Sequence, residues 1–187
     1  MRVEYPDASK FTQEQREQLG RVPINLTQML LHCPVPMVQS FLDFALSFRA
    51  GNLEPKIREL VILRIATLCG SSYELKHHLP AAKTAGWSDQ EISVITSAQP
   101  SVHDQKMSVM IQLVDDCSKL GKVSDSTFEK ASKILSTPEI AEATLLAGLY
   151  EMLACFLKTM GVEMDQYTLK WTEVDRGNSS VCHKTSA

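Results

Sequence analysis

Apolar residues recur at helical spacing along most of this chain, and glycine, proline or serine residues separate one apolar run from the next. No run alternates apolar and polar residues with the period of a strand between turn signals. The pattern therefore predicts an all-α protein. We expect helices over 11–19, 26–32, 36–48, 54–69, 72–85, 102–120, 125–134 and 137–160, and a short helix that begins after Ser88.

The stretch from Leu53 to Ile92 carries most of the candidate chemistry. Its first helix is apolar on several faces, which predicts burial, although it contains Arg58, Glu59 and Arg64. The residues Gly70-Ser71-Ser72 end this helix and offer a cap for the next one, whose first turns hold Tyr73, Glu74, His77 and His78. Titratable groups at a helix junction beside apolar surface tend to have shifted pKa values, so this junction is a candidate site.

The helix predicted over 137–160 is apolar on most of its faces. Such a helix is buried, either at the centre of its own subunit or between subunits. After about Trp171 the chain loses periodicity, and we expect a disordered tail over 171–187.

Composition narrows the classes of partner. The net charge of −3 argues against a nucleic-acid or anionic-membrane partner, and no stretch approaches the roughly 20 apolar residues of a membrane span. The N-terminus has no secretory signal. The five cysteines are far apart and mostly lie among apolar residues, which indicates buried, reduced thiols and a cytoplasmic protein: Cys33, Cys69, Cys117, Cys155 and Cys182. They suggest neither a metal site nor a cofactor site.

The junction also resembles a known family signature. Arg58-Glu59-Leu60, Gly70, Tyr73-Glu74, His78, Gly86 and the run from Ser88 to Ile92 are similar to the motif of the carboxymuconolactone decarboxylase family, which is related to alkyl hydroperoxidase D. The resemblance implies an AhpD-like helical bundle over 36–170, preceded by a helical extension over 1–35. It also implies a homo-oligomer, a trimer or a hexamer.

Helical spacing suggests how the site residues pair. Glu74 and His78 are four residues apart, so the carboxylate can orient the imidazole and raise its pKa. Glu59 needs a partner in its apolar surroundings; Arg64 is one candidate, and it alternatively binds a substrate carboxylate. His77 follows Lys76 and is expected at the surface.

The resemblance implies cofactor-independent decarboxylation of a small carboxylated lactone or a related metabolite. Loss of CO₂ leaves a dienolate that the enzyme must stabilise and protonate on carbon. We expect His78 to supply the proton with Glu74 orienting it, Tyr73 to donate to the oxyanion, and Glu59 to act as a second acid/base group or an anchor. Arg64 and Ser71 are the expected substrate-binding residues.

Two other functions remain open. The related peroxidases carry a C-x-x-C motif before the histidine, and aligning the motifs places Ser71 and Glu74 at the two cysteine positions. Serine cannot cycle through sulfenic acid and a disulfide, which argues against a thiol-dependent antioxidant protein. The other alternative is a non-catalytic oligomeric binding or accessory protein.

Overall fold

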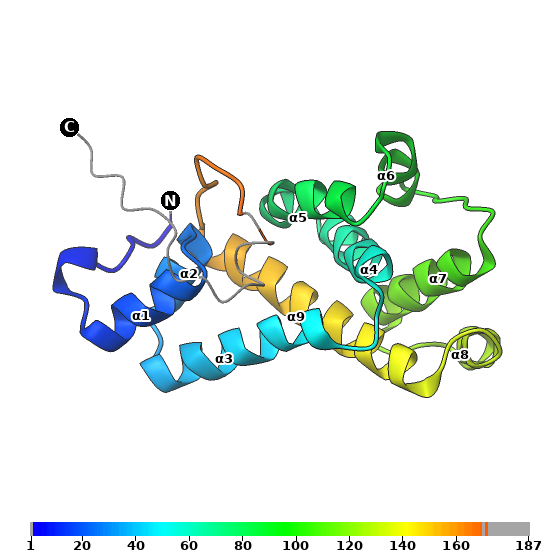
Figure 1. The fold of residues 1–187 in the computed structure, drawn as a ribbon, viewed down its shortest axis with the longest axis horizontal. Coiled ribbons are helices and arrows are strands. Elements are labelled where there is room, and N and C mark those ends of the chain that lie inside the picture. Colours follow the sequence, from blue (N-terminus) through cyan, green and yellow to red (C-terminus); the bar gives the residue numbers. More distant parts are fainter. Residues whose placement is uncertain (1, 170, 172–187) are drawn as a thin grey trace. The chain divides into compact units, whose positions relative to one another are not determined.

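In the computed structural model, which describes residues 2–169 and 171, the chain is helical and contains no strand within those residues (Figure 1). The α-helices are α1 (Gln13–Arg21), α2 (Asn25–Leu30), α3 (Val35–Ser47), α4 (Pro55–Leu68), α5 (Ser72–Thr84), α6 (Asp89–Ile95), α7 (Gln105–Leu120), α8 (Asp125–Ser132) and α9 (Thr137–Met160); short 3₁₀ helices span Ala8–Lys10 and Phe48–Ala50. The predicted all-α class is confirmed. The tail predicted to be disordered lies outside the described residues, apart from Trp171.

Local sequence signals explain where several helices begin and end. Ser88 caps α6 by accepting from the Glu91 backbone, and the Glu91 carboxylate accepts from the Ser88 backbone, which completes a capping box. Ser124 caps α8 by accepting from the Thr127 backbone. Gly121 ends α7 at a φ of 67°, a left-handed conformation that glycine adopts without strain.

The chain forms two compact units. The first unit joins the segment up to Leu46 with the segment that starts at Met160. Within it, the Asn25 backbone donates to the Asp165 carboxylate at 2.9 Å, and the Glu163 backbone donates to the Tyr5 hydroxyl at 2.9 Å. The second unit, Ser47–Thr159, contains the whole candidate junction.

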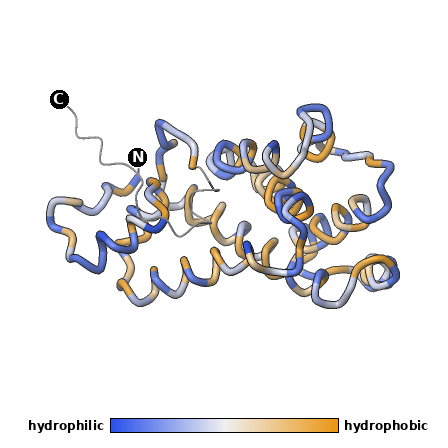
Figure 2. Tube along the Cα trace, in the orientation of Figure 1, coloured by the Kyte–Doolittle hydropathy of each residue, from blue (hydrophilic) through white to orange (hydrophobic). Residues whose placement is uncertain are grey.

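Helix α4 is the centre of the second unit. Ten of its fourteen residues are buried, and it packs against α5 and α7, with α6 making a smaller contact. Figure 2 shows how much of α4 and α9 is apolar. A central position explains why α4 is apolar on several faces. It also means that the charged side chains of α4 need partners inside the protein.

A buried carboxylate joins α9 to the segment that precedes α4. Glu142 accepts from the backbone of Asn52 and, at 3.3 Å, from that of Leu53. Gly51 permits this approach, because a Cβ atom there would lie 2.1 Å from a Glu142 oxygen. Within the described residues, α9 is also the one helix long and apolar enough to cross a membrane by length and composition, although half of that window is buried inside the protein.

Candidate acid and base site

His78 lies at the centre of a buried chain of hydrogen bonds. Its Nδ1 is 2.8 Å from Oε2 of Glu59 on α4, and its Nε2 is 2.9 Å from the hydroxyl of Tyr150 on α9. The His78 and Tyr150 rings meet edge to face, with centroids 5.1 Å apart. Both Glu59 and His78 are almost completely buried. The structure therefore places an imidazole between a carboxylate and a phenol, on three different helices.

The charges around this chain determine its protonation. Burial opposes ionisation of Glu59, but His78, Arg58 and Arg49 outweigh it and lower the pKa of Glu59. Burial lowers the pKa of His78, and Glu59 offsets this only in part. Burial also raises the pKa of Tyr150 well above 10. Before any ligand binds, Glu59 is thus ionised and accepts a hydrogen bond from Nδ1–H of His78. The His78 imidazole is neutral, and its Nε2 accepts a hydrogen bond from Tyr150.

The expected pairing of Glu74 with His78 is wrong. Both carboxylate oxygens of Glu74 lack a hydrogen-bond partner among the described residues, although the side chain is only 4% exposed. Burial raises the pKa of Glu74 to about 8, while the nearby Ser71 hydroxyl and the charge of Lys158 lower it. Glu74 is therefore a neutral carboxylic acid at pH 7.

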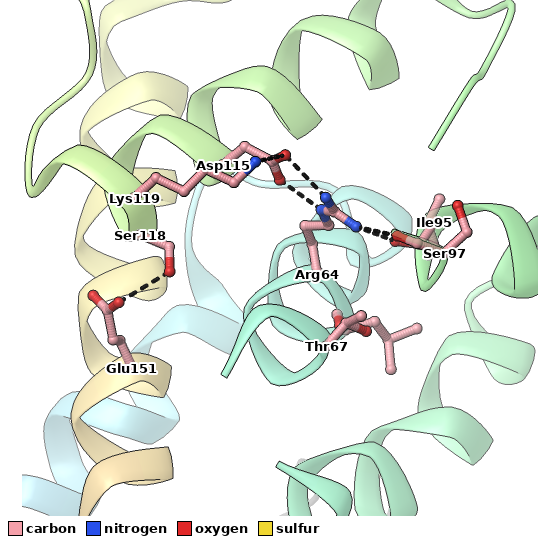
Figure 3. A network of polar contacts seen from close by, with 9 residues as sticks. Arg64, Thr67, Ile95, Ser97, Asp115, Ser118, Lys119 and Glu151 are labelled. Atoms are coloured by element: carbon pink, nitrogen blue, oxygen red, sulfur yellow. Dashed lines mark hydrogen bonds and ion pairs between the residues drawn. The ribbon is translucent and has the colours of Figure 1, made fainter. Parts of the chain in front are cut away.

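Arg64 does not pair with Glu59, which was one of the two roles expected for it. Its guanidinium is fully buried, makes two bonds to the Asp115 carboxylate at 2.6 and 2.9 Å, and donates to the carbonyls of Ile95 and Ser97 (Figure 3). Those contacts tie α4 to α7 and to the end of α6. The cation beside Glu59 is Arg58 instead, with Nε 3.5 Å from Oε1. Arg64 lies five positions from Glu59, and at about 100° per residue the two point to different sides of the helix.

The remaining candidates are also placed. Tyr73 is buried with its ring against His77, at a centroid distance of 4.8 Å, so the hydroxyl next to His78 belongs to Tyr150 and not to Tyr73. His77 was expected at the surface, which is wrong, because it is 2% exposed. Ser71 is buried at the N-cap of α5, where its side chain makes no capping bond.

The cysteines are more accessible than expected. Cys33, Cys69 and Cys117 are partly exposed, Cys155 is exposed, and Cys182 lies outside the described residues. Burial raises the pKa of the Cys69 thiol, and the charges of Glu151 and Glu74 raise it further. The part of the chain that the structure describes holds no group of three or more His, Cys, Asp or Glu residues placed to bind a metal ion.

Sequence reasoning missed Tyr150, Arg58, Arg49 and Lys158 as members or neighbours of this site. Tyr150 is 72 positions from His78, so local spacing cannot connect them. The sequence feature that could have identified Tyr150 is a hydroxyl group in a mostly apolar helix, because a buried hydroxyl usually has a hydrogen-bond partner.

Comparison with known proteins agrees with this architecture. Residues 37–116 match the Carboxymuconolactone decarboxylase family, a segment that contains Glu59, Glu74 and His78 but not Tyr150. Over that segment the chain is similar to this family, and its sequence lacks a C-x-x-C motif. No curated protein matches it.

Two solved structures share the fold at low identity. A peroxidase-related protein from Ralstonia eutropha JMP134, described as an alkylhydroperoxidase AhpD core, has a TM-score of 0.74 and 12% identity, and the match covers 88% of this chain and 92% of that one. A protein of unknown function from Agrobacterium tumefaciens, named as a candidate antioxidant defence protein AhpD, has a TM-score of 0.64 and 18% identity; 69% of this chain and 90% of that one are covered. At these identities the likeness shows the fold alone.

Proposed function

We propose that this protein is a cofactor-independent, decarboxylase-like enzyme that transfers protons to and from a small carboxylated lactone or a related metabolite. The observation that carries the proposal is the buried chain from Glu59 through His78 to Tyr150. A carboxylate that orients an imidazole, and an imidazole that contacts a phenol, is an arrangement suited to general acid and base catalysis. The match of residues 37–116 to the carboxymuconolactone decarboxylase family model supports a reaction of this class.

The hydrogen-bonded residues Glu59, His78 and Tyr150 can deliver a proton if His78 becomes protonated when an anionic substrate binds. Glu59 already accepts from Nδ1, so it stabilises the imidazolium without rearrangement. Protonated Nε2 then donates to the Tyr150 oxygen, which reverses the direction of that hydrogen bond. The Tyr150 O–H is thereby free to donate towards the substrate.

The bonds and charges of the reaction then balance. The bond between the substrate and its carboxylate carbon breaks, CO₂ leaves, and the electron pair passes into the unsaturated lactone as a dienolate. Tyr150 transfers its proton to carbon and recovers one from Nε2 of His78. His78 returns to the neutral form that its lowered pKa favours.

The structural relatives named for AhpD suggest thiol-dependent peroxide reduction as the alternative, but the thiol chemistry argues against it. The nucleophile in such a reaction is a thiolate. Cys69, the cysteine nearest Glu74 in sequence, has a raised pKa, because burial and two neighbouring carboxylates disfavour its charged form. Ser71 and Glu74 stand where the peroxidase motif has its cysteines.

The test is turnover of 4-carboxymuconolactone by the purified protein and its variants. We expect Tyr150→Phe and His78→Gln to lower kcat/KM by about 10²–10⁴-fold, and His103→Gln, at an exposed histidine, to leave it unchanged. Because the step consumes an imidazolium, kcat/KM of the parent should fall as pH rises above the pKa of His78, which lies below 6.5. A parent protein that leaves this and related unsaturated lactone acids intact, or a Tyr150→Phe variant with the parent's rate, contradicts the proposal.

A further inference from the structure

Glu74 is a buried carboxyl group that the proton-transfer chain leaves unused. It lies in the first turn of α5, is 4% exposed, and has no hydrogen-bond partner for either oxygen among the described residues. Most buried polar atoms in native proteins are paired, so each exception calls for an explanation, such as a ligand that is absent. An unpaired acid beside a candidate catalytic chain points to ligand recognition.

Lys158 of α9 brings a positive charge to the same junction. Its Nζ donates to the carbonyl of Cys69, and it lies 3.6 Å from the place where a Cβ on Gly70 would be. Lys158 is otherwise exposed. The positive charge of Lys158 favours the ionised form of Glu74 and so lowers the pKa of that group.

The titratable groups near Glu74 come from three helices. Lys158 and Tyr150 of α9 and Cys69 at the end of α4 interact electrostatically with Glu74, and Ser71 lies at the start of its own helix. Burial is the dominant effect and raises the pKa of Glu74 to about 8. At pH 7 the junction therefore offers a neutral O–H donor and an ammonium group, a combination that suits an anionic oxygen ligand.

We propose that Glu74 and Lys158 together bind a carboxylate group of the small-molecule ligand, with Glu74 as a protonated hydrogen-bond donor and Lys158 as the positive charge. The inference rests on the proposed function in taking the ligand to be a carboxylated lactone. The carboxylate concerned is one that the reaction retains, since holding the departing group would stabilise the substrate over the transition state.

Calorimetric titration with a stable probe tests the site. The probe is 5-oxotetrahydrofuran-3-carboxylate, a saturated lactone acid without the double bond that decarboxylation needs, and its neutral match is γ-butyrolactone. We expect the acid to bind at least about tenfold more tightly than γ-butyrolactone at pH 7. Its affinity should stay level up to about pH 8 and then fall by about tenfold per pH unit, because deprotonated Glu74 repels the ligand.

Variants separate the two recognition groups. Lys158→Gln should weaken binding of the acid by about 10- to 100-fold, whereas Lys133→Gln, at the exposed residue that follows α8, should not change it. Glu74→Gln should keep the affinity at pH 7 within a few fold, since an amide also donates, and should abolish the fall above pH 8. Unfolding curves check that each variant is folded.

Several outcomes overturn the inference: a parent that does not bind the acid, equal affinity for the acid and γ-butyrolactone, a parent affinity that stays level to pH 9.5, or a Lys158→Gln variant that binds like the parent. A parent that binds the acid as described, yet turns over no unsaturated lactone acid, refutes the proposed reaction and leaves the binding site standing.

Discussion

The protonation state of Glu74 makes the stability of this protein depend on pH in a way that one substitution removes. The folded carboxyl has a pKa raised to about 8 by burial, whereas its ordinary value is 4.5. Between those values the unfolded chain releases a proton that the folded chain retains. The free energy of unfolding should therefore decrease as pH rises from about 4.5 to about 8.

The size of the effect follows from the same two pKa values. A difference of one pKa unit corresponds to about 1.36 kcal/mol, so the interval between 4.5 and about 8 corresponds to on the order of 4–5 kcal/mol. Glu74→Gln keeps the shape of the side chain and cannot ionise. Parent and variant should have similar stability near pH 5, and the variant should become the more stable of the two as pH approaches 9.

Urea unfolding of both proteins at half-unit steps from pH 5 to 9 measures the difference directly. Other titrating groups are common to both proteins and cancel in the difference, which should grow by as much as about 1.4 kcal/mol per pH unit and then level off above about pH 8. Glu129→Gln, at an exposed carboxylate paired with Lys133, serves as the matched control and should show no such growth. Parallel stability curves for the parent and Glu74→Gln would show that Glu74 is ionised at neutral pH and would refute the reasoning.

Two further predictions concern the frame around the site. Asp115→Ala leaves the fully buried Arg64 guanidinium without its carboxylate, and it should lower the free energy of unfolding in urea titrations by about 3 kcal/mol. Replacing both residues by apolar ones should restore most of that loss. A change under about 0.5 kcal/mol for Asp115→Ala contradicts the structural role of the pair. We also expect the protein to self-associate through α9, because Leu145 is 57% exposed in that apolar helix. Light scattering should show an oligomer for the parent and a smaller species for Leu145→Glu. A parent that is monomeric at micromolar concentration rules this out.

The helices were predictable because their signals are local. The expected range 137–160 matches α9 at both ends, and the other boundaries either agree or differ by one to three residues, where the chain could enter or leave a helix at several positions. The capping box at Ser88 and the stop at Gly121 depend on side chains and φ angles within a few residues. Such features need no knowledge of what the helix packs against.

The site was predictable only in part, because spacing on one helix does not say what lies opposite. Four residues separate Glu74 from His78, and this spacing suggested a pair. In the folded protein the His78 ring meets Glu59 across the boundary between α4 and α5. Glu74 does not reach His78, and burial is the main cause of its raised pKa.

The polar residues of α9 show how the missing half of the site could have been found. Tyr150 and Lys158 interrupt a helix that is otherwise apolar on most faces, and they lie eight positions apart, which returns them to neighbouring stripes of the helix surface. Burying a hydroxyl without a partner costs stability, so a tyrosine in such a helix predicts a polar partner elsewhere in the core. The α4–α5 junction holds such buried polar groups, among them Glu59, Glu74 and His78. In the folded protein the Tyr150 hydroxyl meets His78 there, so the polar partner that a tyrosine in α9 requires comes from α5.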